Sequence, residues 1–122
     1  MNNLIIIGHP DKNSFCHSGI FKTITNTFEK YPNHNIKTID LYKDKLHRDK
    51  EDLVNSYKNL VTWSDRIYFI SPVWWFRLTP KMETFFDEVF TPGFAYEFVN
   101  ITKTYAYPRA FLKKKKIRCY LT

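Results

Sequence analysis

Apolar residues along this chain form two kinds of pattern, short continuous runs and longer stripes with helical spacing. The runs at residues 4–7 and 67–70 are rich in β-branched and aromatic side chains, which is typical of parallel strands buried on both faces. Residues 36–41 alternate more between apolar and polar side chains, as an edge strand does, and residues 117–121 form a further run. The pattern therefore predicts four strands.

Three amphipathic helices are predicted between these strands. The first carries an apolar stripe between residues 20 and 28, and the second spans residues 49–63. Thr79 and Pro80 predict the start of the third, as an N-cap followed by proline at the first helical position. Because strands and helices alternate, we expect a single α/β domain over residues 1–122, with a parallel sheet and helices on both of its faces.

The composition is that of a globular domain, with 43% hydrophobic and 25% charged residues. Aromatic residues reach 18%, which suggests rings that line a flat-ligand pocket or an interface, although core packing also absorbs many. No apolar run approaches the roughly 18 residues of a membrane span, and the first three residues lack the basic start of a signal peptide. Cys16 and Cys119 lie far apart, so we expect no disulfide framework, no metal site and a cytoplasmic location.

The net charge of +7 comes entirely from the end of the chain. Seven basic residues and no acid follow Thr102, so the preceding part is neutral. A nucleic-acid binder usually spreads its basic residues along one face, and we therefore expect no nucleic-acid partner. We interpret the four lysines at residues 113–116 as a solvated turn before the last strand.

Ligands of open parallel sheets bind beyond the carboxyl ends of the strands, which draws attention to two loops. The first, residues 8–16, leads into a helix N-terminus, where free amides favour an anion. His9, Asn13 and Ser14 suit a phosphate there, but Ser14 could equally be only the helix N-cap. The loop matches neither the Walker A pattern nor the dinucleotide fingerprint. Cys16 could be a thiolate nucleophile, although its place inside the helix favours a buried small residue.

The second loop, residues 71–76, places three aromatic rings at the mouth of the sheet. Trp74, Trp75 and Phe76 either pack against the protein or a partner chain, or form a platform for a planar ring system. The rest of the chain offers no carboxylate pair and no Ser/His/Asp arrangement, and we interpret Asp40 and Asp44 as solvated charges.

These two loops carry a family resemblance. Gly-His-Pro followed by Ser-Phe-Cys, the segment Ser-Pro-Val-Trp-Trp-Phe, and the later Phe-Thr-Pro-Gly-Phe-Ala-Tyr resemble the signature of the flavodoxin-like NAD(P)H:quinone oxidoreductases. The likeness covers residues 3–122 and points to the bacterial branch, with its drug-activity modulators and potassium-efflux ancillary oxidoreductases. It implies a flavodoxin-like three-layer sandwich whose sheet has the strand order 2-1-3-4, with the fifth strand missing.

The resemblance also implies a function. FMN, or FAD, would lie at a homodimer interface, take a hydride from NAD(P)H and reduce a quinone-like acceptor, and a membrane-protein partner is conceivable in this branch. Tyr96 and Trp75 are the residues expected nearest the reaction, which the flavin itself carries. By family analogy, the flavin phosphate would be held by His9, Ser14, Phe15 and Cys16. The flavin ring would be flanked by Pro72, Val73, Trp74, Trp75 and Phe76.

The chain departs from the family after Thr122. Relatives continue with a Thr-Thr-Gly-Gly-like turn that holds the flavin ring, and then a last helix and strand. We therefore expect a truncated relative that keeps the fold but binds FMN weakly, with poor or absent quinone reductase activity. The alternative is a non-catalytic interaction protein that dimerises through its aromatic surface.

Overall fold

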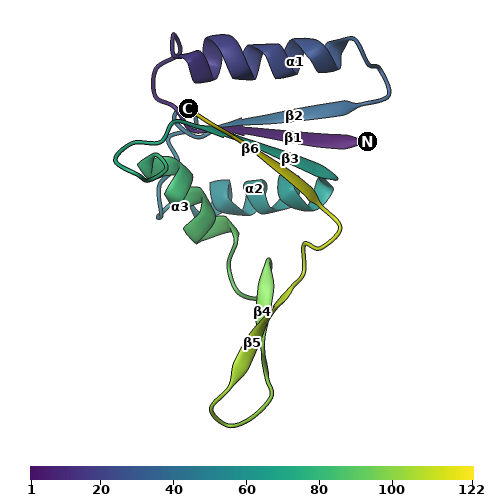
Figure 1. Ribbon diagram of the computed structural model, residues 1–122, viewed down its shortest axis with the longest axis vertical. Coiled ribbons are helices and arrows are strands. Elements are labelled where there is room, and N and C mark those ends of the chain that lie inside the picture. The colour runs from purple at the N-terminus through teal and green to yellow at the C-terminus, as the bar shows by residue number, and fades with distance from the viewer.

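The computed structural model describes residues 1–122 and contains one four-stranded parallel sheet. The sheet order is β2 (Asn35–Asp40), β1 (Asn2–Ile7), β3 (Arg66–Ser71) and β6 (Lys116–Leu121), and every neighbouring pair is parallel (Figure 1). The predicted α/β class and the predicted order 2-1-3-4 are confirmed, with β6 as the fourth strand of this sheet.

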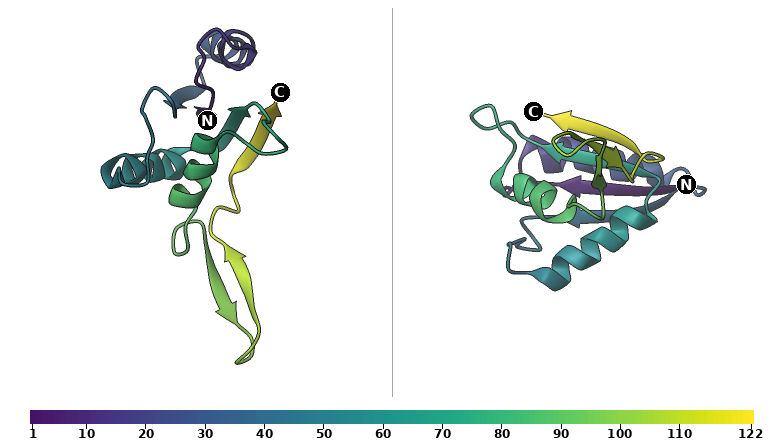
Figure 2. Two further views of the ribbon diagram at one scale, coloured as in Figure 1. Left: turned by 90° about the vertical axis from the view of Figure 1, so that its left-hand side faces the viewer. Right: turned by 90° about the horizontal axis from the view of Figure 1, so that it is seen from below.

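Helices cover the two faces of the sheet unequally. One face carries only the helical segment that begins as the π-helical η1 (Cys16–Phe21) and continues as α1 (Lys22–Glu29). The other face carries α2 (Glu51–Trp63) and α3 (Pro80–Val89) (Figures 1 and 2). The three predicted helices are confirmed. None of the helices combines the length and the apolar character needed to cross a bilayer.

The two faces of the sheet build two cores of different size. Thirteen buried residues, among them Leu4, Phe69 and Phe85, fill the space between the sheet and the pair α2 and α3. On the α1 side the buried cluster has only five residues, and no residue of α1 itself is buried. This imbalance arises because a single helix covers that face and leaves the region over β6 open.

A β-hairpin that the sequence analysis did not predict projects from the body of the protein (Figure 1). Its strands β4 (Tyr96–Asn100) and β5 (Ala106–Ala110) pair only with each other. Phe98, Ile101 and Tyr105 are each about 60% exposed on this arm. So much exposed apolar surface on a protruding arm is typical of a contact region for another molecule.

The lysine run before β6 is only partly a solvated turn. Lys113, Lys114 and Lys116 are exposed, as expected, but Lys115 reaches the C-terminal end of α2. Its Nζ donates hydrogen bonds to the carbonyl oxygens of Thr62, at 3.2 Å, and Ser64, at 2.5 Å. A lysine at this place satisfies otherwise unpaired carbonyls and complements the negative end of the helix dipole.

The interpretation of Asp40 and Asp44 as solvated charges is also wrong. The Asp40 side chain is only 14% exposed and forms a 2.5 Å ion pair with Lys12, which ties the first loop to the end of β2. Asp44 accepts a 2.7 Å hydrogen bond from the hydroxyl of Tyr57. Burial raises the pKa of Tyr57 above its usual range, and the hydrogen bond to Asp44 raises it further.

Candidate functional site

The carboxyl ends of β1, β3 and β6 meet at one edge of the sheet. The amide of Gly8 donates to the carbonyl of Ile70, and the amide of Val73 donates to the carbonyl of Thr122 at 2.9 Å. Cys16 Sγ lies 3.6 Å from Thr122 Oγ1. The structure therefore joins both predicted loops and the end of β6 into one surface.

The first loop is folded on its own side chains. The carboxylate of Asp11 accepts from the amide of Asn13 at 2.8 Å, and Ser14 Oγ accepts from the amide of His17 at 3.4 Å. The Ser14 hydroxyl therefore lies beside the first turn of the helix, whose N-cap residue, Phe15, makes no side-chain capping bond. The amides of the next two residues, Phe15 and Cys16, donate to no acceptor within the chain. Two unpaired amides at a helical N-terminus are the arrangement that binds an anion. The interpretation of Ser14 as the N-cap residue is wrong by one position, since that place belongs to Phe15.

Three rings connect the first loop to the second. His17 is 8% exposed, and its Nε2 lies 3.0 Å from the carbonyl oxygen of His9. The His9 ring in turn meets the Trp74 ring edge-on, with 5.6 Å between the ring centroids. These contacts fix the position of His9 between the two loops.

The second loop ends in a tight turn with unusual occupants. Trp74 and Arg77 exchange backbone hydrogen bonds of 2.8 and 3.1 Å, and both residues between them have positive φ angles, 52° at Trp75 and 64° at Phe76. This geometry is that of a type I′ turn, which strongly prefers asparagine and glycine. Here it presents two aromatic side chains that are 91% and 98% exposed. Strain of this kind, held on a surface loop, is a feature of functional sites.

A buried hydroxyl locks the first loop onto α3. Thr79 occupies the N-cap position, as predicted, but its side chain makes no capping bond. Its Oγ1 instead donates to the carbonyl of Gly8 at 2.8 Å. A Cβ at Gly8 would lie 3.0 Å from the Cε of Met82, so this joint tolerates no larger residue without displacement.

The structure thus brings together most of the predicted residues. Cys16 is buried within η1, which agrees with its interpretation as a small packed residue, and the Phe15 ring lies against Gly19. Tyr96, in contrast, is not part of this surface. It lies at the base of the hairpin, beyond the C-terminal end of α3, whereas both loops lie at the N-terminal end of α3 (Figure 1). Sequence reasoning assigned no contact within the site to three residues that organise it: His17, Thr79 and Thr122. These predicted residues lie on the joined surface: His9, Ser14, Cys16, Pro72, Val73 and Trp74.

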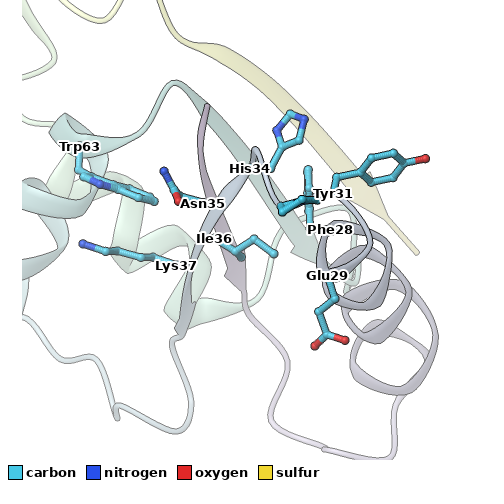
Figure 3. A pocket seen from close by; sticks show the side chains of 9 residues that line it. Phe28, Glu29, Tyr31, His34, Asn35, Ile36, Lys37 and Trp63 are labelled. Atoms are coloured by element: carbon cyan, nitrogen blue, oxygen red, sulfur yellow. The ribbon is translucent and has the colours of Figure 1, made fainter.

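Two of the hollows elsewhere on the molecule are lined by aromatic side chains. One, of about 550 Å³, lies near the start of β2, with Trp63 and Lys37 on one side of the strand and Tyr31 and His34 on the other (Figure 3). Lys37 Nζ sits 4.5 Å from the centroid of the Trp63 ring. Nothing in this hollow resembles a reactive arrangement. The other hollow, of about 600 Å³, is named here the α1–β6 groove and has this lining: Phe15, Gly19, Ile20, Thr23, Ile24, Thr27, Phe28, Arg66, Tyr68, Arg118 and Tyr120.

Solved structures share this architecture. The chain superposes on Smu.1420 from Streptococcus mutans with a TM-score of 0.84 and 27% sequence identity, covering 99% of this chain and 67% of that one. It matches an NAD(P)H:quinone oxidoreductase from Methanothermobacter marburgensis with a TM-score of 0.70 and 24% identity, covering 80% of this chain and 57% of that one. It also matches an FMN-dependent NADH-azoreductase from Bacillus anthracis, in complex with FMN, with a TM-score of 0.68 and 16% identity, covering 99% and 67% of the two chains.

The chain therefore spans between 57% and 67% of the length of these three proteins. Comparison with curated proteins finds no match. A family model described as flavodoxin-like fold matches residues 1–122, the whole chain. The sheet order, the helical layers and this match agree, and the chain belongs to the family of proteins with a flavodoxin-like fold.

Proposed function

We propose that this chain is a flavin-binding oxidoreductase of the NAD(P)H:quinone oxidoreductase kind that uses FMN. The observation that carries the proposal is the surface where β1, β3 and β6 end, with two unpaired amides at one side and an exposed aromatic turn at the other. Solved neighbours described as an NAD(P)H:quinone oxidoreductase and as an FMN complex support the same assignment.

The residues present suit the two ends of such a cofactor. The amides of Phe15 and Cys16, with the hydroxyl of Ser14, would hold the phosphate, because charged acceptors bind most strongly to preorganised donors. The segment from Pro72 to Phe76 would lie along the planar ring. When bound, the flavin supplies the redox chemistry, accepting a hydride from NAD(P)H and passing two electrons to a quinone-like acceptor.

The chain's own residues orient and shield the ring. The ring of Trp74 is held against His9, so it offers a fixed flat wall rather than a mobile side chain. The side chains of Trp75 and Phe76 are exposed to solvent in the single chain. Once a ligand or a second chain covers them, they would exclude water from the flavin ring. FAD in place of FMN would use the same phosphate amides.

We further propose that the working unit is a homodimer. The hairpin arm and the turn at Trp75 and Phe76 expose more apolar surface than a monomer usually leaves in water. Tyr96 lies on the arm, away from its own loops, so it would contribute to the loops of the partner subunit.

The test is a comparison of FMN and riboflavin binding. Ser14→Ala should weaken FMN binding by about tenfold or more, since a hydrogen bond to a charged group contributes about 1.5–3 kcal/mol. Riboflavin, which lacks the phosphate, should bind equally well to both forms. Ser56→Ala, at an exposed position on α2, is the matched control.

Equal losses for the two ligands would place the phosphate elsewhere. A purified protein that binds neither ligand would favour the second candidate, a non-catalytic interaction protein, to which the exposed hairpin arm also points. For the dimer, Phe98→Ser combined with Ile101→Ser should convert a particle of about twice the chain mass to a monomer in light scattering. Tyr31→Ser, an exposed aromatic position just after α1 on the other face of the sheet from the hairpin, should leave the mass unchanged.

A further inference from the structure

His17 is a buried imidazole beside the two unpaired amides of the first loop. It follows Phe15 and Cys16 directly on η1, and it is only 8% exposed. The segment η1 is π-helical, a conformation that is rare and occurs frequently at functional sites. Buried polar side chains are nearly always hydrogen-bonded, so the partner of this ring indicates what it does.

The partner of the His17 ring is the backbone of the first loop. His17 Nε2 lies 3.0 Å from the carbonyl oxygen of His9, and Nε2 carries the proton because a carbonyl oxygen only accepts. The preceding carbonyl, that of Gly8, accepts from Thr79 Oγ1. Two successive carbonyls at the start of the loop are therefore held by side chains from two different helical segments.

The bond from His17 closes a circuit of hydrogen bonds around the loop. The amide of Asp11 donates to His9 Nδ1 at 3.0 Å, and the amide of Ser14 donates to the carbonyl of Asp11 at 3.1 Å. The amide of His17 then donates to the carbonyl of Ser14, also at 3.1 Å. The two unpaired amides lie between the last two members of this circuit, so its geometry fixes where they point.

We propose that His17 is a positioning residue for the phosphate end of the flavin site, an inference that rests on the proposed function. Its ring ties the start of the first loop to the same helical turn that carries the unpaired amides. The loop is then already in its binding conformation before a ligand arrives. Preorganisation of this kind raises affinity, because the apparent affinity falls with the fraction of molecules in the competent conformation.

The second loop does not depend on this bond. The turn at its end is held by backbone hydrogen bonds between Trp74 and Arg77, and the amide of Val73 is bonded to Thr122. Loss of the His17 bond should therefore disturb the phosphate end of the site and leave the aromatic end in place.

The test compares FMN with riboflavin in variants of the 122-residue chain. His17→Leu fills the space but has no donor, and it should weaken FMN binding by about tenfold while riboflavin, which lacks the phosphate, binds as before. His17→Gln places an amide N–H as far along the side chain as Nε2, and it should restore FMN affinity to within about twofold of the wild type.

The matched control is His34→Leu. This variant removes another partly buried imidazole, whose Nδ1 lies 3.3 Å from the side-chain nitrogen of Asn3 near the start of β2. It should leave the affinities for both ligands unchanged.

A second measurement needs no flavin. The amides of Asp11 and Ser14 are donors in the circuit, and their hydrogen exchange can be followed by NMR. His17→Leu should speed this exchange by about tenfold relative to the amides of β1, and His17→Gln should not.

Several results would overturn the proposal. Unchanged FMN affinity in His17→Leu is one, and equal losses for FMN and riboflavin, which would mean that His17 only stabilises the fold, are another. A failure of His17→Gln to restore binding is the third. If circular dichroism shows that His17→Leu is unfolded, His17→Asn takes its place, since its shorter amide does not reach the His9 carbonyl. A wild type that binds no FMN would refute the proposed function, and the exchange measurement would still decide whether His17 holds the loop.

Discussion

Thr79 is the residue on which the shape of the candidate site most depends. It has no exposed surface, and its Oγ1 donates a 2.8 Å hydrogen bond to the carbonyl of Gly8, the first residue after β1. This bond joins the first loop to the start of α3, which follows the second loop. Thr79→Val replaces the hydroxyl by a methyl group of nearly the same size and leaves the Gly8 carbonyl buried without its donor.

The size of the effect follows from burial. A buried group left without its hydrogen-bond partner costs about 1–3 kcal/mol, whereas the same loss at an exposed site costs much less. For a chain of this length, each kcal/mol lost from the free energy of unfolding lowers Tm by roughly 3–5 °C. The variant should therefore lower Tm by about 3–15 °C, and FMN affinity should fall further because the first loop is no longer held.

The assay is thermal unfolding followed by circular dichroism, together with FMN titration of the folded protein. Thr84→Val is the matched control, since the Thr84 hydroxyl donates to the carbonyl of Pro80 at 2.9 Å on the exposed side of the same helix. The control should change stability by less than about 0.5 kcal/mol. Equal Tm values for the two variants would refute the claim that the Gly8 carbonyl depends on Thr79.

Three other changes test the rest of the molecule. Tyr57→Phe removes a hydroxyl whose pKa is raised in the folded state. Above about pH 10 only the unfolded tyrosine loses its proton, so the free energy of unfolding of the wild type falls by up to about 1.4 kcal/mol per pH unit. Urea unfolding across that range should show this decline reduced in Tyr57→Phe, and an unchanged slope would contradict it. Lys115→Met should cost about 1 kcal/mol through loss of the bonds to the α2 carbonyls, and a neutral result would show that they contribute nothing. Replacing Trp75 and Phe76 by Asn and Gly should raise the free energy of unfolding by about 1–3 kcal/mol while weakening FMN binding, and no gain in stability would mean that the turn is not strained.

The layered part of the fold could be predicted because it depends on local patterns. The four strands of the sheet and helices α2 and α3 lie within two residues of their predicted bounds, since a strand buried on both faces needs a continuous apolar run and a helix needs a stripe. The hairpin β4–β5 could not be predicted in this way. Every residue of β5 is exposed, and Pro108 interrupts the strand, so no buried face imposes an alternating pattern.

The proximity of the two predicted loops could be expected from the sequence, but the bonds that connect them could not. The rule that ligands bind at the carboxyl ends of parallel strands selected two loops that the structure brings together, without any knowledge of contacts. The bonds that shape these loops join residues far apart in the sequence, as Thr79 and Gly8 are, or Thr122 and Val73. Lys115 reaches α2 over more than fifty residues for the same reason. A periodic pattern in the sequence cannot predict such long-range pairs.

The turn at Trp75 and Phe76 is the point where local preference and structure disagree most. A type I′ turn selects small or polar residues, and a chain optimised for stability alone would place asparagine and glycine there. Two large aromatic side chains at positive φ, nearly fully exposed, are unfavourable both for the backbone and for hydration. Local rules are broken in this way where function requires it. The same strain that destabilises the isolated chain aims two rings outward beside Trp74, where a flat ligand or a second subunit can cover them.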